Sequence, residues 1–393
     1  MTALRICLIS QEFPPYTNWG GIAVYNGMLA HELAQHGHEV VVISRVQGNA
    51  PARELIEERV CVLRVGTPIW RKILVGRTVD RMLQAHAVAA AVRPLHAQKR
   101  FDIFETTEAS FEGEQLQRDG ALRPHFIIQC NGSNAFGQAA GGLLAPLHRI
   151  DWAWSFRHEQ LALRRAGHIV VTSNATREVI LRQGIAAAKV RLIYQGIDTR
   201  QFRPAEAHGI DPTLQVGFVG RLESRKGIDF IWRVVETIGP DNGVHFHLRG
   251  AVHPANASDT RARLRRYARW VTHHAPCGHD EMPGFYRSLH VLLQPSRFEN
   301  FGLAYAEAMA SGLLVIAGVG GSAREVVHDG VTGLLVDPDG TTDVAVDAIR
   351  KLVRDRGSFD AMRAAARRDV EQRFSLESCI KAKVALYDEV AGK

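Results

Sequence analysis

The chain has 393 residues, 46% of them hydrophobic and 23% charged, and its formal net charge at pH 7 is +7. These proportions are typical of globular proteins and exclude a disordered chain, and the length predicts about two to three domains. No apolar run approaches the roughly 18–20 residues that span a bilayer, and no secretory signal is recognised, so a cytoplasmic protein is expected. The five cysteines have no C-x-x-C spacing, which argues against a disulfide framework. The positive charge favours a polyanion, a phosphorylated ligand or an anionic membrane surface as a partner.

The first half of the chain alternates expected strands and helices. A helix over 22–36 ends at Gly37, and strand-like apolar runs are expected at 4–10, 40–43, 59–65, 101–104, 126–129, 168–172 and 189–193. This alternation predicts a parallel, doubly wound α/β sheet.

A second series of the same kind follows, with strands expected at 215–219, 244–249, 291–294, 313–317 and 334–336. Helix-rich sequence occupies 343–374, and a last helix covers 376–390. The short polar stretch 205–212 contains Gly and Pro, so the domain boundary is placed there, between 1–204 and 205–375. The sequence thus predicts two doubly wound Rossmann-like domains of nearly equal size.

A loop that follows an expected strand and opens a helix carries the cations Arg221 and Lys226 near its two ends, between Gly220 and Gly227. It lacks the spacing of a P-loop. The glycines allow close backbone approach, and the cations would hold a diphosphate by charge-assisted hydrogen bonds. The alternative is a solvated basic turn.

Two carboxylates, Glu299 and Glu307, flank a Phe-Gly loop and the helix-forming run after it. If the helix begins near Gly302, Glu307 lies about a turn and a half inside it and Glu299 lies beside its N-terminus. Free N–H groups and the helix dipole favour a bound anion there. A ligand with hydroxyls at both ends and phosphates between them, such as a nucleotide-sugar, suits this arrangement. Otherwise Glu307 is a helix surface residue and Glu299 a neighbour of the N-cap.

The full run around these carboxylates resembles the retaining glycosyltransferases of family four, which have the GT-B fold. The resemblance covers most of the chain and is carried by Pro295-Ser296, Glu299-x-Phe301-Gly302-Leu303, Glu307-Ala-Met-Ala-x-Gly312 and Val315-Ile316-Ala317. It implies that the two domains face each other across a cleft, with the acceptor in the first and the donor in the second. It also implies that the last helix, 376–393, packs back on the first domain.

The resemblance assigns roles to individual residues. Arg221 and Lys226 match the positions that bind the donor diphosphate, Glu299 the position that binds the transferred sugar, and Glu307 the position that binds the ribose. With Glu299, the first two are the implied catalytic residues. Further implied donor contacts are Gly20, Gly21, Asn300, Phe301, Gly302, Leu303 and Ser322.

Acceptor contacts are predicted in the first domain. Asn131 stands where many members of the family carry His, which leaves mainly a main-chain role. Glu105 and Glu108 follow an expected strand whose carboxyl end should face the cleft, together with Glu112 and Glu114. The alternative for this acidic cluster is a solvated loop and helix face.

No cofactor and no metal ion are expected, because Arg221, Lys226 and a helix N-terminus would supply the positive charge at the donor diphosphate. His273-His274-x-x-Cys277-x-His279 has metal-ligand spacing, but it lacks a second Cys pair.

Peripheral contact with an anionic membrane, at its inner face, is a further hypothesis. It rests on basic segments with apolar residues at 261–270 and at 70–75 with Arg77 and Arg81, and sedimentation with anionic vesicles would test it. The alternative is that these faces pack on their own domains. No nucleic acid is expected as a partner.

The resemblance implies a retaining transferase, for glycan, glycolipid or secondary-metabolite biosynthesis. It would move a hexosyl or N-acetylhexosaminyl unit from a UDP-, GDP- or ADP-sugar to the hydroxyl of a sugar, a lipid-linked molecule or a small molecule. Two alternatives are a nucleotide-sugar epimerase or hydrolase of the same fold and a non-catalytic protein that binds sugar nucleotides.

Overall fold

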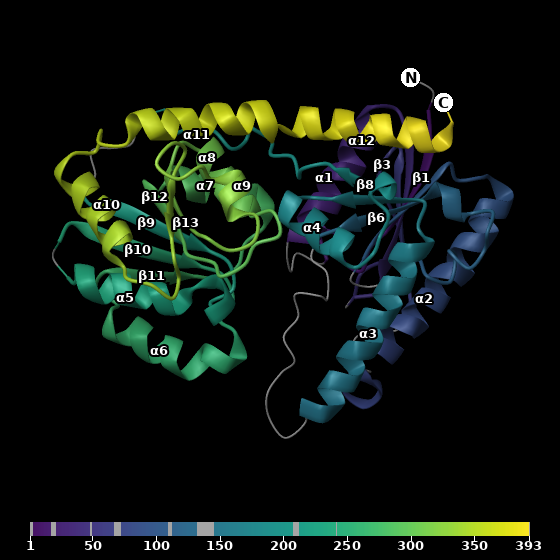
Figure 1. Cartoon of the computed structure of the whole chain (residues 1–393), viewed down its shortest axis with the longest axis horizontal. Coiled ribbons are helices and arrows are strands. Elements are labelled where there is room, and N and C mark those ends of the chain that lie inside the picture. The colour runs from purple at the N-terminus through teal and green to yellow at the C-terminus, as the bar shows by residue number, and fades with distance from the viewer. Residues whose placement is uncertain are drawn as a thin grey trace. The chain divides into compact units, whose positions relative to one another are not determined.

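A computed structural model describes residues 3–16, 21–47, 49–66, 72–108, 112–131, 145–206, 212–240 and 242–392. The chain divides into two compact units, one made of Met1–Tyr194 with Ile380–Lys393 and the other of Gln195–Cys379. Each unit is built on its own twisted sheet with helices on both faces (Figure 1).

The first unit has an eight-stranded sheet in the order β3-β4-β2-β1-β5-β6-β7-β8. Its strands are β1 Arg5–Ile9, β2 Glu39–Arg45, β3 Arg53–Glu57, β4 Val60–Val65, β5 Ile103–Thr107, β6 Phe126–Cys130, β7 His168–Val171 and β8 Val190–Leu192. β3 pairs antiparallel with β4, and the other neighbours in this sheet pair in parallel. The helices are α1 Gly21–Gln35, α2 Lys72–Gln98, α3 Ala145–Arg165 and α4 Asn174–Arg182.

The central strands of this sheet are buried on both faces, which is why β1 and β6 appear in the sequence as mainly apolar runs. Phe104 of β5 and Phe126 of β6 stack with ring centroids 5.0 Å apart, and Val88 and Val92 of α2 belong to the same core cluster.

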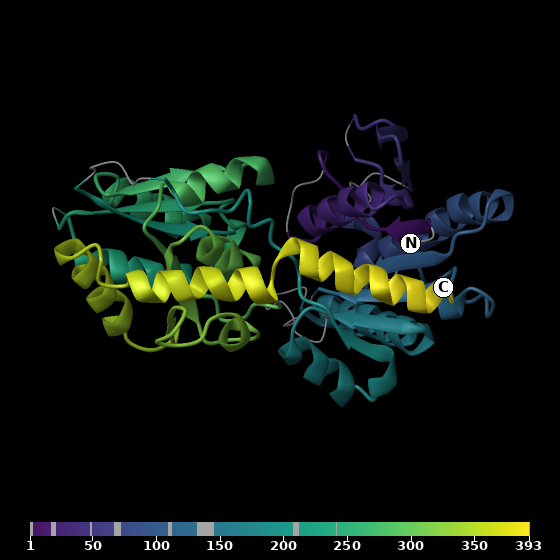
Figure 2. The ribbon, with the colours of Figure 1, turned by 90° about the horizontal axis from the view of Figure 1, so that it is seen from above.

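The second unit has a six-stranded parallel sheet in the order β11-β10-β9-β12-β13-β14. Its strands are β9 Leu214–Val219, β10 Val244–Arg249, β11 Val271–His274, β12 Val291–Gln294, β13 Leu314–Gly318 and β14 Leu334–Val336. Its helices are α5 Ile228–Ile238, α6 Ala257–Arg266, α7 Met282–Arg287, α8 Leu303–Ala310, α9 Ala323–Val326, α10 Asp343–Arg354 and α11 Asp360–Arg373. α5, α6 and α10 share one core with the sheet, while α8 lies on the opposite face, under α11 (Figures 1 and 2).

The units divide at Tyr194, about ten residues before the boundary that the sequence placed after 204. The segment between these two positions, 195–204, is fixed to the second unit by hydrogen bonds of its backbone atoms. Ile197 N donates to Phe374 O at 2.8 Å, and the Arg367 guanidinium donates to Phe202 O and Thr199 O at 2.5 and 2.9 Å.

The last helix, α12 Leu376–Ala391, joins the first unit from Ile380 onward. Lys383 Nζ donates to Gln129 Oε1 at 2.6 Å and lies 3.0 Å from Glu105 Oε2, which also accepts from Tyr387 OH at 2.7 Å. The side chains of Lys383 and Glu105 are 1% and 4% exposed. Burial lowers the pKa of Lys383, and the Glu105 carboxylate opposes that shift. This buried network therefore ties α12 to β5 and β6.

Candidate functional site

The donor residues predicted in the second unit lie on loops at the carboxyl ends of its strands and on the helix α8, where open parallel sheets bind ligands. The loop after β9 and the loop after β12 touch. Gly227 has φ +78°, and a Cβ on it would lie 2.0 Å from Pro295 O. Only glycine allows this approach, which brings the basic loop against the segment that carries Glu299.

The structure brings Lys226 and Glu299 into direct contact. Lys226 Nζ donates to Glu299 Oε1 at 2.6 Å, and the Ser296 hydroxyl donates to the same oxygen at 2.7 Å. The Lys226 and Glu299 side chains are 18% and 12% exposed, so the ion pair is partly shielded from water. A cation and a carboxylate, 73 positions apart in the sequence, thus form one cluster.

Arg221 is placed differently. Its guanidinium lies 3.3 Å from Glu223 Oε1, and its side chain is 55% exposed. Arg225 Nη2 donates to the same oxygen at 3.0 Å. Arg221 is therefore an exposed cation at the entrance of the basic loop, held by Glu223.

Ser322 supports the backbone of Glu299. Its amide N–H and its hydroxyl both donate to Glu299 O, at 2.9 and 3.2 Å. Gly321, with φ +67°, forms a bridge to Glu299, and a Cβ on it would lie 2.1 Å from Glu299 O. The Ser322 groups that were predicted to face the donor are thus already used to hold the loop.

The residues between the two carboxylates have separate environments. The Asn300 side-chain oxygen is buried without a hydrogen-bond partner. Phe301 is 2% exposed and packs edge-on against Phe374, so its side chain belongs to the core. Gly302, with φ +85°, is the N-cap of α8, and Leu303 is the first residue of that helix.

Glu307 is 6% exposed, inside α8, and both of its carboxylate oxygens are engaged. His279 Nε2 lies 2.9 Å from Oε1, and Tyr286 OH donates to Oε2 at 2.8 Å. The alternative of a helix surface residue is therefore wrong for Glu307. Burial lowers the pKa of His279, but the hydrogen bond to Glu307 and the charges of Glu307 and Asp280 together raise it overall.

His279 thus has a role that the sequence did not indicate. The spacing of His273, His274, Cys277 and His279 resembles a metal site, yet the described residues contain no cluster of three or more His, Cys, Asp or Glu that could hold a metal ion. His273 Nε2 contacts Gly250 O, while His274 contacts His247. No local sequence pattern indicates this role of His279, because its partner Glu307 lies 28 positions away, on α8.

In the first unit, the four acidic residues predicted for the acceptor are buried, with exposures of 1–3%, and do not form a solvated face. Glu105 is bound by α12, and Glu114 lies 2.8 Å from His158 and 3.2 Å from Arg165. Glu108 Oε2 accepts from Asn131 N at 3.0 Å.

The remaining carboxyl of this cluster, Glu112, has a pKa raised to about 8, mainly by burial. Of the residues predicted to contact the acceptor, Glu108 and Asn131 are therefore hydrogen-bonded to each other, whereas Glu105 is bound to α12.

The two glycines predicted to contact the donor belong to the first unit. Gly21 is the exposed first residue of α1, whereas Gly20 lies outside the described residues.

The basic stripe of α6 packs on its own unit. Tyr267 is 3% exposed, Leu264 joins the core, and Arg263 pairs with Glu236 and Asp259. This apolar face is therefore not available to a membrane. Of the other candidate segment, residues 70 and 71 lie outside the described part of the chain, and the side chains of 72–75 and of Arg77 are not described. Within the described part of the chain, no helix combines the length and the apolar character needed to cross a bilayer.

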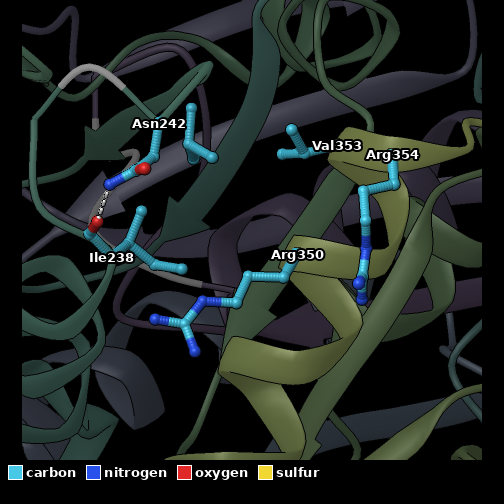
Figure 3. Close-up of a pocket in the computed structure, with 6 residues that line it drawn as sticks. Ile238, Asn242, Arg350, Val353 and Arg354 are labelled. Atoms are coloured by element: carbon cyan, nitrogen blue, oxygen red, sulfur yellow. Dashed lines mark hydrogen bonds between the residues drawn. The ribbon is translucent and has the colours of Figure 1, made fainter.

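A cavity of about 290 Å³ in the second unit lies away from the predicted site residues (Figure 3). It is lined by Ile238, Asn242, Val244, Arg350, Val353 and Arg354. Val244 is the first residue of β10, so this cavity lies at the amino ends of the strands, opposite the Lys226–Glu299 cluster. None of the predicted site residues lines it.

Comparison with known proteins agrees with this geometry. Residues 19–201 match the model of Glycosyltransferase Family 4, and residues 203–369 match that of Glycosyl transferases group 1. D-inositol 3-phosphate glycosyltransferases of Mycobacterium bovis and Mycobacterium tuberculosis are 28% identical over 408 residues, covering 95% of this chain and 80% of theirs.

Solved structures share the fold along the whole chain. Sucrose-phosphate synthase from Thermosynechococcus elongatus superposes with a TM-score of 0.82 at 23% identity, covering 98% of this chain and 99% of that one. The catalytic domain of starch synthase IV from Arabidopsis thaliana, bound to ADP and acarbose, gives 0.76 at 15% identity with full coverage of both chains (100%). Anabaena HepE, in complex with UDP and glucose, gives 0.73 at 19% identity and covers 98% of this chain and 100% of its own.

The predicted fold is thereby confirmed. Both units have Rossmann-like, mainly parallel sheets, the two family matches adjoin each other, and the relatives cover nearly the whole chain. These findings agree on the predicted fold. The chain is a glycosyltransferase with the GT-B fold, and its first half is similar to Glycosyltransferase Family 4.

Proposed function

We propose that this glycosyltransferase moves a hexosyl or N-acetylhexosaminyl unit from a nucleoside diphosphate sugar to an acceptor hydroxyl, with retention at the sugar carbon. The observation that carries the proposal is the contact of Lys226 with Glu299 at the carboxyl ends of the strands, with Glu307 on the helix that follows. The names of the relatives support a nucleotide donor, because HepE was solved with UDP and with UDP-glucose, and starch synthase IV with ADP.

The ion pair has a role in this reaction. A diphosphate is a stronger partner for Lys226 than one carboxylate, so donor binding would draw the ammonium group away from Glu299. Glu299 would then accept hydrogen bonds from sugar hydroxyls, since an ionised carboxylate is an acceptor only. Asn300 Oδ1, buried and unpaired, would accept a further one.

The bond changes are those of a direct exchange on one face of the sugar. The acceptor oxygen bonds to the anomeric carbon as the bond from that carbon to the phosphate oxygen breaks. The acceptor proton passes to the leaving phosphate, and Lys226 and Arg221 stabilise its growing charge. A panel of UDP-, GDP- and ADP-sugars, assayed with and without acceptors, tests the proposal. Nucleotide release that no acceptor increases would instead favour a hydrolase.

Substitutions of the two carboxylates should have different effects on nucleotide binding and on turnover. Glu299→Gln is expected to lower kcat while the affinity for the free nucleoside diphosphate stays equal or rises, because the change releases Lys226. Glu307→Ala is expected to weaken that affinity about 10- to 100-fold, from the loss of about 1.5–3 kcal/mol for hydrogen bonds to a charged group. Calorimetry with the nucleoside diphosphate measures both effects, and unchanged binding by Glu307→Ala would refute the ribose role.

Transfer is expected to need no divalent metal ion. Lys226, Arg221 and the N-terminus of α8 supply positive charge where a metal would otherwise act. The rate should therefore survive EDTA. Full loss of activity in EDTA, with recovery on adding Mn²⁺, contradicts this expectation.

A further inference from the structure

Glu307 is held by two side chains from elements that precede it in the sequence. Tyr286 lies on α7, and His279 begins the short 3-10 helix His279–Glu281. Each supplies one donor to a different carboxylate oxygen, at 2.8 and 2.9 Å. Each oxygen has two acceptor positions. One position on each oxygen therefore stays open, which matches the two hydroxyls of a ribose.

Burial makes these donors necessary. The Glu307 side chain is 8% exposed, and a buried carboxylate is costly unless it is hydrogen-bonded. Burial and the Glu307 charge both raise the pKa of Tyr286, which keeps its hydroxyl protonated as a donor.

The rings of the two donors are themselves fixed. Phe202 packs against both, with ring centroids 5.3 Å from His279 and 5.9 Å from Tyr286. Phe202 is 1% exposed, so it forms a rigid backing for the pair. The carboxylate of Glu307 is thus restrained in position before any ligand arrives.

We propose that His279 and Tyr286 are positioning residues that orient the Glu307 carboxylate toward the ribose hydroxyls of the donor nucleotide. This inference rests on the proposed function. Orientation before binding removes part of the ordering cost from the binding step. Because the ribose does not react, the contact stabilises ground state and transition state alike, and its loss raises KM more than it lowers kcat.

The experiment compares a nucleoside diphosphate with its 2′,3′-dideoxy analogue, using whichever of UDP, GDP and ADP the protein binds most tightly. His279→Ala and Tyr286→Phe are expected to weaken binding of the ribonucleotide about fivefold or more, an effect of the size of one ordinary hydrogen bond. Neither change should alter binding of the dideoxy analogue. His279→Gln, whose amide can donate to the same oxygen, should retain most of the affinity.

A matched control is Tyr267→Phe, since Tyr267 OH donates to Glu236 at 2.6 Å in the same unit without contacting Glu307. This variant should bind both nucleotides as the unchanged protein does. Equal weakening of both nucleotides by His279→Ala and Tyr286→Phe would overturn the inference and leave the two residues a structural role only. If Glu307→Ala itself loses no preference for the ribonucleotide, the proposed ribose site fails, and this inference with it.

Discussion

Replacing Lys226 by alanine is expected to lower kcat/KM for the donor about 10²- to 10³-fold, the usual loss for one preorganised group that stabilises developing charge. Lys226 is the only partly shielded cation at Glu299 among the described contacts, whereas Arg221 is half exposed. The loss should appear in kcat as well as in KM, because the leaving diphosphate gains charge in the transition state. Steady-state kinetics with the preferred donor measures both.

The matched control for this change is Arg225→Ala. Arg225 lies next to Lys226 in the same short 3-10 helix, but its ion pair is with Glu223 and its side chain is 45% exposed. The Arg225→Ala substitution removes one positive charge, as Lys226→Ala does, but at a side chain that does not contact Glu299. Similar losses in the two variants would mean that only the general positive field of the loop matters, and the assignment of Lys226 to the diphosphate would fail.

Replacing Lys383 by methionine is expected to lower the free energy of unfolding of the first unit by about 3–5 kcal/mol, the cost of leaving one member of a buried ion pair alone. Glu105 would keep the hydroxyl of Tyr387 but lose its cation in a site only 4% exposed. Urea unfolding, followed by a probe in the first unit, measures this change in free energy.

Lys381→Met is the control, because Lys381 is exposed on the same helix and an ordinary surface change costs within about 0.5 kcal/mol. Adding Glu105→Gln to Lys383→Met should restore part of the loss by removing the isolated charge. A Lys383→Met protein as stable as the Lys381→Met protein would show that the ion pair does not anchor α12.

The sequence predicted the central strands of both sheets well, since strands buried on both faces are continuous apolar runs, as in Val291–Gln294. It missed one edge strand of each sheet, although it predicted the opposite edges, β8 and β14. β3 consists of Arg-Glu-Leu-Ile-Glu and β11 of Val-Thr-His-His, whose polar side chains carry no such signal. Their positions are set by pairing with β4 and β10, respectively.

The sequence by itself also indicated which residues could bind a nucleotide-sugar, because the segments that contain Arg221, Lys226, Glu299 and Glu307 resemble those of family-four glycosyltransferases. Tertiary structure decided what each of them touches. Lys226 meets Glu299, and Glu307 meets His279 and Tyr286.

Tertiary structure also moved Glu105 out of the predicted acceptor group. Its partner Tyr387 lies 282 positions away in the chain, and no local pattern in the sequence links two such residues. Their contact exists because α12 packs on β5 and β6, where a buried carboxylate requires a cation and hydrogen-bond donors. Local patterns fix secondary structure and motif chemistry, whereas burial and the partners of buried charges depend on how distant segments pack.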